Sequence, residues 1–188
     1  MRKILLTLMS LVLMMLPGMA LSTELVTNGG FETGDFTGWT QSGNLGFTGV
    51  VNSPVHSGTY AAQFGPVGSL GSISQTLPTV NGGIYNLNFW LDNSGGTPNE
   101  FTVIWGGDTK VDELDLPGFT WTSRSISLIG TGLPTELTFG FRQDPSFFHF
   151  DDVSVTEAAA VPEPATMLLL GSGLIGLAGY GRKKFFKK

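Results

Sequence analysis

The side chains that catalysis uses most often are few in this chain, and their spacing does not assemble a reaction centre. Its two histidines, His56 and His149, do not lie in the His-Glu-x-x-His spacing that places two imidazoles on one metal ion. No Gly-x-Ser-x-Gly turn presents a serine nucleophile. The absence of cysteine excludes thiol chemistry and thiolate metal sites. Glu32 and Asp35 lie three residues apart, but glycoside cleavage needs a defined separation of two carboxylates in space. The sequence therefore argues against an enzyme.

A different chemistry, the stacking of a sugar ring on an aromatic side chain, has better support. Along residues 83–92 one face of an expected strand carries Asn86, Asn88, Trp90 and Asp92. An aromatic ring among amides is the composition of such a stacking platform. Arg142, on the polar face of its own strand, completes the candidate ligand-binding set of Asn86, Asn88, Trp90 and Arg142. The alternative is that Trp90 packs under a loop or against a second sheet.

The elements that would position these residues are β-strands. Apolar residues alternate with polar ones in three runs, and the apolar sets are Tyr85, Leu87, Phe89 and Leu91; Phe101, Val103 and Trp105; and Leu137, Phe139 and Phe141. Turn-forming segments such as Asn81-Gly-Gly and Gly106-Gly-Asp separate the runs, and no sustained helical period is present. The pattern predicts an all-β fold, a β-sandwich or jelly roll. Trp39, Trp105 and Trp121 are expected in its core.

The N-terminus has the pattern of a secretory signal peptide over residues 1–22. A basic Met1-Arg2-Lys3 precedes an apolar run over residues 4–16, and small residues follow, so we expect cleavage after Ala20 or Ser22. The partners that this implies are signal peptidase and the secretion machinery. The alternative is an uncleaved N-terminal anchor.

Residues 23–157 form one expected domain, which is long enough to bury a core without disulfides. The net charge of the whole chain is −5, but most of its cations lie in the two ends. Between residues 23 and 160, three cations stand against fourteen carboxylates, so this part carries a formal charge of −11. Such a surface repels phosphate backbones, which excludes nucleic-acid binding, and it attracts divalent cations.

Residues 158–188 are a linker followed by three segments in a fixed order. Pro162 and Pro164 favour extended backbone around Val161, Pro162, Glu163 and Pro164. An uncharged run over residues 165–180 would give a helix of roughly 24 Å, which is short for a bilayer core of about 30 Å. The basic residues Arg182, Lys183, Lys184, Lys187 and Lys188 would hold the C-terminus on the cytoplasmic side.

This tail resembles the PEP-CTERM sorting signal of bacterial envelope proteins, because the Val-Pro-Glu-Pro motif, the glycine-rich apolar segment and the basic terminus occur together. The resemblance implies that an exosortase cuts near the Pro-Glu-Pro element. It also implies a transient stop in the membrane, followed by delivery to the cell surface or the extracellular matrix. The alternative is an ordinary C-terminal membrane anchor after a proline-containing linker.

The domain also resembles the galactose-binding-like jelly rolls of many carbohydrate-binding modules. The matching residues are Asn28-Gly-Gly-Phe-Glu32, Val55-His-Ser-Gly58 and Asp151-Asp-Val-Ser-Val155. In that fold the first and last strands meet, so the resemblance brings Glu32 close to Asp151 and Asp152. It implies a structural Ca²⁺ held by Glu32 and Asp152, or by Asp151, with backbone oxygens of Gly30 and Thr59. The alternative is a solvated strand end and a turn.

The function that we expect is that of an exported, non-catalytic surface or matrix protein that binds carbohydrate and associates with exopolysaccharide or biofilm. The alternative is a surface adhesin or protein-interaction module without sugar recognition.

Overall fold

The computed structural model describes residues 22–158 and 171–173. The chain divides into two units, one of Ser22–Ala158 and one of residues 1–21 and 159–188. Only residues 171–173 of the second unit are described, and they are helical. The signal peptide, the Pro-Glu-Pro motif, most of the apolar run and the basic terminus therefore lie outside the described residues. Among the residues that are described, we find no helix whose length and apolar character would suffice to cross a membrane.

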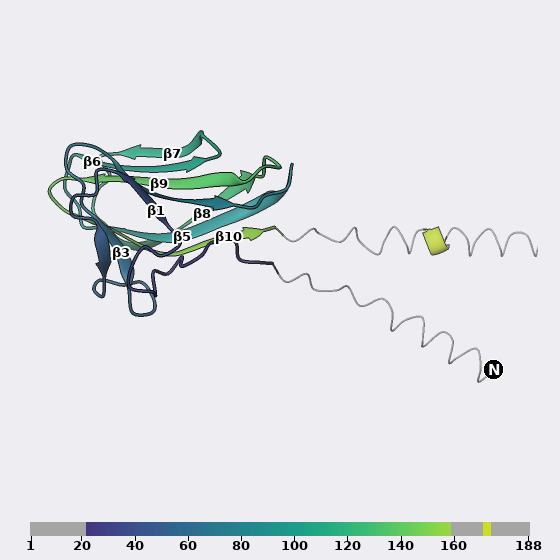
Figure 1. The fold of residues 1–188 in the computed structure, drawn as a ribbon, viewed down its shortest axis with the longest axis horizontal. Coiled ribbons are helices and arrows are strands. Elements are labelled where there is room, and N and C mark those ends of the chain that lie inside the picture. Colours follow the sequence, from purple (N-terminus) through teal and green to yellow (C-terminus); the bar gives the residue numbers. More distant parts are fainter. Residues whose placement is uncertain (1–21, 159–170, 174–188) are drawn as a thin grey trace, which may run out of the picture. The chain divides into compact units, whose positions relative to one another are not determined.

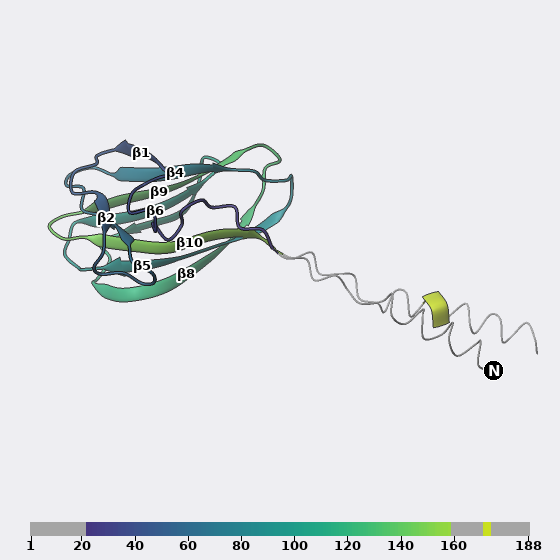
Figure 2. The ribbon, with the colours of Figure 1, turned by 60° about the horizontal axis from the view of Figure 1, so that its bottom comes forward.

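The domain is a sandwich of two antiparallel sheets, as the alternating sequence pattern predicted (Figures 1 and 2). One sheet has the strand order β1-β4-β9-β6-β7 and the other β2-β3-β10-β5-β8. We call them the β9 sheet and the β10 sheet after their central strands. The strands are β1 (Thr40–Gly43), β2 (Gly49–Val51), β3 (Ala61–Phe64), β4 (Gly71–Leu77), β5 (Ile84–Asn93), β6 (Asn99–Trp105), β7 (Asp108–Leu114), β8 (Phe119–Ile129), β9 (Thr135–Gln143) and β10 (Phe148–Glu157).

The two ends of the domain meet on β10, which lies in the middle of its sheet. The Leu25 N–H donates to the Val155 carbonyl, and Glu24 forms an isolated antiparallel bridge with Thr156. Ala158, the last residue of the unit, donates its N–H to the Ile84 carbonyl at the start of β5. The chain therefore enters and leaves the sandwich at one end, which we call the exit end (Figure 1).

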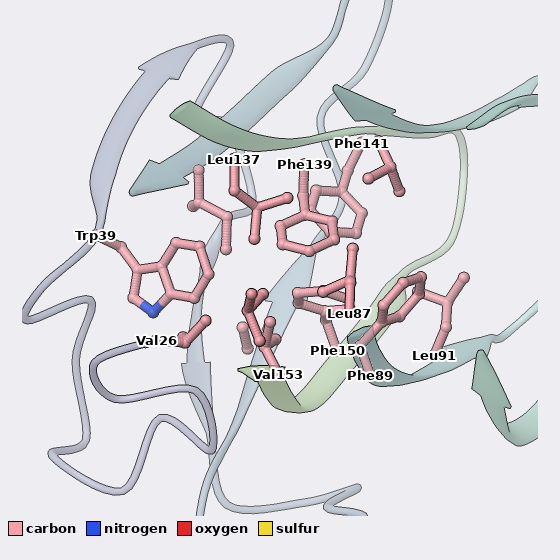
Figure 3. Packing of buried hydrophobic residues seen from close by; sticks show 14 of the residues in the cluster. Val26, Trp39, Leu87, Phe89, Leu91, Leu137, Phe139, Phe141, Phe150 and Val153 are labelled. Carbon is pink, nitrogen blue, oxygen red and sulfur yellow. The ribbon is translucent and has the colours of Figure 1, made fainter. Parts of the chain in front are cut away.

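The core is a layer of aromatic and aliphatic side chains between the sheets (Figure 3). All three alternating apolar sets predicted from the sequence are buried there. Phe150 of β10 lies 4.6 Å from Phe139 of β9 between ring centroids, and 5.3 Å from both Phe89 and Phe141. Because these rings come from both sheets, their packing holds one sheet against the other.

The tryptophans divide between the core and the surface. Trp39 and Trp105 are buried, as expected. Trp121 is not in the core, and this expectation was wrong: it is half-buried and contacts the rings of His56 and His149 on the outer face of the β10 sheet. Pairing with β5 is regular from Ile84↔Ile129 to Leu91↔Thr122. Alternation counted back from the buried Leu128 therefore places Trp121 on the outer face of the sheet.

The connections from β1 to β2, β3 to β4, β5 to β6, β7 to β8 and β9 to β10 all pass from one sheet to the other at the end opposite the exit. Backbone hydrogen bonds tie them together: Asn44 N–H donates to Leu70, Ser94 N–H to Phe147, and Gln143 N–H to Pro66. We call this the loop end of the sandwich.

The aromatic layer predicts a large effect of truncating its central ring. Phe150→Ala should lower the free energy of unfolding by about 3–5 kcal/mol, because it leaves a cavity among five phenylalanine rings. Phe47→Ala, which truncates an exposed ring, should stay within about 0.5 kcal/mol. Urea unfolding of both variants measures the difference, and equal stabilities would contradict the packing described.

Candidate functional site

A cleft of about 240 Å³ opens at the loop end of the sandwich. It lies between the loops before β2, after β3 and before β10. We call it the loop-end cleft, and its lining residues are Phe47, Gly65, Val67, Gln143, Asp144, Pro145, Ser146 and Phe147. Apolar rings and aliphatic groups share this wall with a carboxamide, a carboxylate and a hydroxyl. Such a mixture of apolar and polar groups can contact a small molecule.

Phe47 presents its ring to solvent at the rim of this cleft, with 72% of the residue exposed. Its φ is 56°, a left-handed conformation that is strained for a bulky residue. The surrounding loop holds it there: the Gly65 N–H donates to the Phe47 carbonyl, and the Asn44 side chain accepts from Gly46 N–H and donates to the Val67 carbonyl. Strain of this kind persists only where neighbouring contacts impose it, and it is frequent at ligand sites.

Gln143 supplies a polar group in the wall of the cleft. Its side chain is fully buried, and Nε2 donates to Asn93 Oδ1 at 2.5 Å. The other amide atom, Oε1, is buried and has no hydrogen-bond partner in the described part of the chain. A buried acceptor without a donor is uncommon in folded proteins. A ligand hydroxyl could reach this acceptor only if the Gln143 side chain shifts, because Oε1 is buried.

Phe147 forms the wall that faces the loop after β3. A methyl group added at Gly65 would lie 2.8 Å from two atoms of the Phe147 ring. Glycine at position 65 thus leaves room for the Phe147 ring next to the backbone. Asp144 is the one charged residue of the lining, so the cleft has no cation among its lining residues.

The predicted stacking platform is largely covered. Asn86, Asn88 and Trp90 do share the outer face of β5, and Asn86 is exposed, but Trp90 is half-buried. The ring of His56, from the loop over residues 52–60, stacks on Trp90 at 3.7 Å between centroids and 16° between planes. The structure thus places Trp90 under a loop, which was the alternative left open by the sequence. One face of its indole is occupied by protein.

Arg142 does not belong to this surface. It lies on β9, on the outer face of the opposite sheet, so the two sheets separate it from Asn86, Asn88 and Trp90. Its register neighbour on β6 is Glu100, and its Nε atom is buried without a partner in the described residues. The predicted grouping of Arg142 with Trp90 is therefore wrong. Sequence alone shows that each side chain is on a polar face, but not that the two faces point in opposite directions.

The sequence analysis did not predict that His56, His149 and Trp121 would lie close to one another on the outer face of the β10 sheet. His56 Nδ1 lies 2.6 Å from Asp152 Oδ2, and His149 Nδ1 lies 2.8 Å from Asp92 Oδ1. Trp121 contacts both imidazole rings from β8. No periodic signal links these residues, because they meet only after β5, β8 and β10 pair. For Phe47 a signal existed: a large aromatic residue in the turn-rich segment Asn44-Leu-Gly-Phe has no place in a strand core.

The predicted calcium ligands Glu32, Asp151 and Asp152 all lie near Gly30. A methyl group added at Gly30 would lie 3.5 Å from Asp152 Oδ1, 3.8 Å from Asp151 Oδ1 and 3.8 Å from Glu32 Cγ. All three carboxylates face the loop over residues 52–60. Gly58 allows this approach, since its φ is 65° and any side chain there would collide with the Glu32 carboxylate.

Hydrogen-bond donors of that loop already engage these acids. Asp151 Oδ2 accepts from the N–H groups of His56 and Ser57, at 3.0 and 3.2 Å. Asp152 Oδ1 accepts from Ser57 Oγ at 2.8 Å. Glu32 Oε1 accepts from the N–H groups of Thr59 and Tyr60. We call this set of contacts the carboxylate anchor of the His56 loop.

Burial raises the pKa of Asp151, and the nearby charge of Asp152 adds to this, while hydrogen bonds from the Ser57, Asp152 and His56 N–H groups oppose it. The anchor therefore contains one carboxylate whose ionised form is disfavoured by burial and supported by three N–H donors.

The anchor has the oxygen chemistry that calcium prefers, and Asp152 and Glu32 retain acceptor sites beyond the bonds named above. Thr59, however, turns its N–H toward Glu32. Across residues 22–158 and 171–173, no three His, Cys, Asp or Glu side chains are arranged to hold a metal ion. Calcium binding thus stays a prediction.

Asp35, weighed above as the partner of Glu32, is a turn-forming residue. Its carboxylate accepts from Thr33 Oγ1 at 2.7 Å and from the Thr37 N–H at 2.9 Å. Hydrogen bonds from Thr37 and Thr33 lower its pKa. Glu32 instead accepts hydrogen bonds from the His56 loop, so the two acids have different partners.

The carboxylate anchor predicts that Asp151→Ala will release the His56 loop. The substitution leaves three backbone N–H groups unpaired, each of which costs about 1–3 kcal/mol when buried. Amide hydrogen exchange at Ser57 and Asp152 should accelerate, and tryptophan emission should shift to the red as Trp90 loses its cover. Glu136→Ala, an exposed acid on β9, is the matched control. Unchanged exchange at Ser57 would contradict the anchor.

Comparison with known families identifies the tail. Residues 160–183 match the PEP-CTERM protein-sorting motif. This motif indicates a secreted protein that the exosortase pathway handles and that is transiently anchored in the membrane. The prediction made from the Val-Pro-Glu-Pro segment is thereby confirmed. No curated protein matches the chain significantly.

Solved structures with a similar fold include several carbohydrate-binding modules. The module TmCBM61, solved with β-1,4-galactotriose, has a TM-score of 0.59 and 23% identity, over 73% of this chain and all of that one. The CBM22-1 xylan-binding domain of Paenibacillus barcinonensis Xyn10C has a TM-score of 0.53 and 16% identity, over 76% and 99%. The K3 cleaved adhesin domain of Lys-gingipain from Porphyromonas gingivalis has a TM-score of 0.53 and 17% identity, over 72% and 99%.

These similarities show the fold and not the ligand, since all three identities are below 25%. The fold is the jelly-roll sandwich of carbohydrate-binding modules, as predicted. The chain is thus a jelly roll of this type followed by a PEP-CTERM sorting motif.

Proposed function

We propose that the domain is a non-catalytic carbohydrate-binding module whose ligand enters the loop-end cleft. The observation that carries this proposal is the exposed, backbone-strained Phe47 at the rim of the cleft that Gln143 also lines. A sugar ring would lie on the phenyl face. A shift of the Gln143 side chain would let its buried Oε1, which has no partner among the described residues, accept a hydrogen bond from a sugar hydroxyl. The likeness to modules solved with galactotriose and described as xylan-binding supports the ligand class.

The negative charge of the domain indicates whether the glycan that it binds is charged or neutral. Asp144 is the charged group of the lining, and residues 23–160 carry a formal charge of −11. Uronic-acid or sulfated polymers would be repelled from such a surface. We therefore propose a neutral polysaccharide as the ligand. Because the sorting motif indicates a secreted protein, the polymer would be one outside the inner membrane, such as the exopolysaccharide of the matrix or biofilm.

One comparison favours a second candidate function, that of a surface adhesin that binds protein. The adhesin domain of Lys-gingipain has a similar fold at the same TM-score as the xylan-binding domain. The loop-end cleft would then hold a side chain of the partner protein instead of a sugar.

The proposal predicts that Phe47→Ala weakens binding to a neutral polysaccharide at least about tenfold, or about 1.4 kcal/mol. Isothermal titration against a panel of neutral and anionic polysaccharides measures this, with neutral polymers bound more tightly. Leu114→Ala, another exposed apolar residue, should leave binding unchanged.

A second variant separates the two candidate surfaces. Trp90→Ala should retain polysaccharide affinity if the cleft is the site, since His56 already covers one face of the Trp90 indole. Loss of affinity in Trp90→Ala together with normal affinity in Phe47→Ala would move the site to the β10 sheet. Absence of binding across the whole panel would favour the adhesin function.

We also propose that a calcium ion binds at Glu32 and Asp152, with Asp151 close by, and stabilises the His56 loop. A ligand that binds the native state alone raises the melting temperature. Calcium should therefore raise the melting temperature of the chelator-treated protein, and Glu32→Gln should reduce that rise while Glu136→Gln preserves it. Identical melting curves with calcium and with chelator, together with no metal by elemental analysis, would refute the proposal.

A further inference from the structure

The exit end of the sandwich carries a group of exposed aliphatic side chains. Four of them stand at this end, and their exposed fractions are 56% for Val80, 53% for Ile84, 67% for Ile129 and 70% for Leu133. Ile84 and Ile129 are direct cross-strand partners on β5 and β8. We call these four residues the exit patch.

The patch stands on backbone that hydrogen bonds hold in place. The Gly82 N–H donates to the Gly130 carbonyl, and the Gly130 N–H donates to the Gly83 carbonyl. Thr79 Oγ1 donates to the Leu133 carbonyl across the same two loops. Val80 and Leu133 therefore project from loops that are tied to each other and to the ends of β5 and β8. The hydrogen bonds of the domain itself therefore hold the backbone of the patch in place, without a binding partner.

The patch lies where the chain leaves the domain. The Ala158 N–H donates to the carbonyl of Ile84, which is itself a member of the patch. The match to the sorting motif begins at residue 160, and the uncharged run expected to enter the membrane begins at residue 165, seven residues after Ala158. Seven extended residues span at most about 25 Å. During the transient membrane stage, the exit end is consequently the part of the domain that the tether keeps closest to the bilayer.

We propose that the exit patch contacts the lipid surface of the membrane while the sorting tail is still attached. The short tether gives the patch a high effective concentration at the bilayer, so a weak apolar contact suffices. Four aliphatic side chains on loop tips and strand ends suit shallow insertion below the headgroups. Glu157 and Glu136 are exposed acids at the same end, so the surface recognised is one of electrically neutral lipid headgroups.

This contact has a consequence for release. A contact that depends on the tether weakens as soon as cleavage near the Pro-Glu-Pro element removes the tail, because the effective concentration falls to the bulk value. The patch therefore orients the anchored domain without retaining the processed one. The proposal rests on the membrane stage of the sorting motif and is independent of sugar binding.

The absence of cysteine makes the test direct, because one introduced thiol can be labelled specifically. Ile129→Cys and, as a matched control, Leu114→Cys of equivalent exposure (67% and 65%) would carry an environment-sensitive fluorophore. The full-length chain is reconstituted into phosphatidylcholine vesicles at less than one chain per vesicle. We expect a blue shift at position 129, with quenching by nitroxide-labelled acyl chains, and neither effect at position 114.

Two further arms distinguish other occupants. A blue shift at position 129 that grows with the number of chains per vesicle, without acyl-chain quenching, would show contact with a second copy and overturn the proposal. Water-like emission at both positions in the anchored chain would also overturn it, and would assign the patch to no lipid contact. A far-ultraviolet circular dichroism spectrum equal to that of the wild type confirms that the labelled chains are folded.

Discussion

The contact between Phe139 of β9 and Phe150 of β10, with the rings packed around it, is the interaction on which the rest of the structure depends (Figure 3). It joins the central strands of the two sheets. The loops that connect one sheet with the other lie at the two ends of the sandwich. Five of these turns gather at the loop end and form the cleft, while the chain termini gather on β10 at the exit end. The domain therefore has two structurally different ends on either side of this packed layer.

The alternation of apolar and polar residues along the strands was sufficient to predict which side chains form this layer. Tyr85, Leu87, Phe89 and Leu91 had to share one face, and they do. Alternation does not say which faces are brought together. Trp90 and Arg142 both lie on polar faces, yet the sandwich turns those faces in opposite directions. Trp121 lies seven residues before the buried Leu128, so alternation along β8 assigns it to the outer face, contrary to our expectation. Phe47 lies in a loop, where no period applies.

The carboxylate anchor shows why residue types at a site do not settle its chemistry. Glu32, Asp151 and Asp152 all lie near Gly30 and face the His56 loop. Three acids at close range need compensation, and either a divalent cation or N–H donors can supply it. The N–H donors of residues 56–60 supply at least part of it, and only backbone geometry could show that. The same geometry seats His56 over Trp90, so the anchor also decides that this tryptophan is covered.

The two ends of the sandwich carry the two proposed surfaces. At the loop end, the exposed Phe47 ring and the Gln143 carbonyl are the groups proposed to bind a sugar. At the exit end, the exposed aliphatic side chains are proposed to contact lipid. The chain leaves the domain at the exit end, and the loop-end cleft lies at the opposite end of the sandwich. If both proposals hold, the lipid contact and the polysaccharide contact therefore use separate surfaces and could form at the same time.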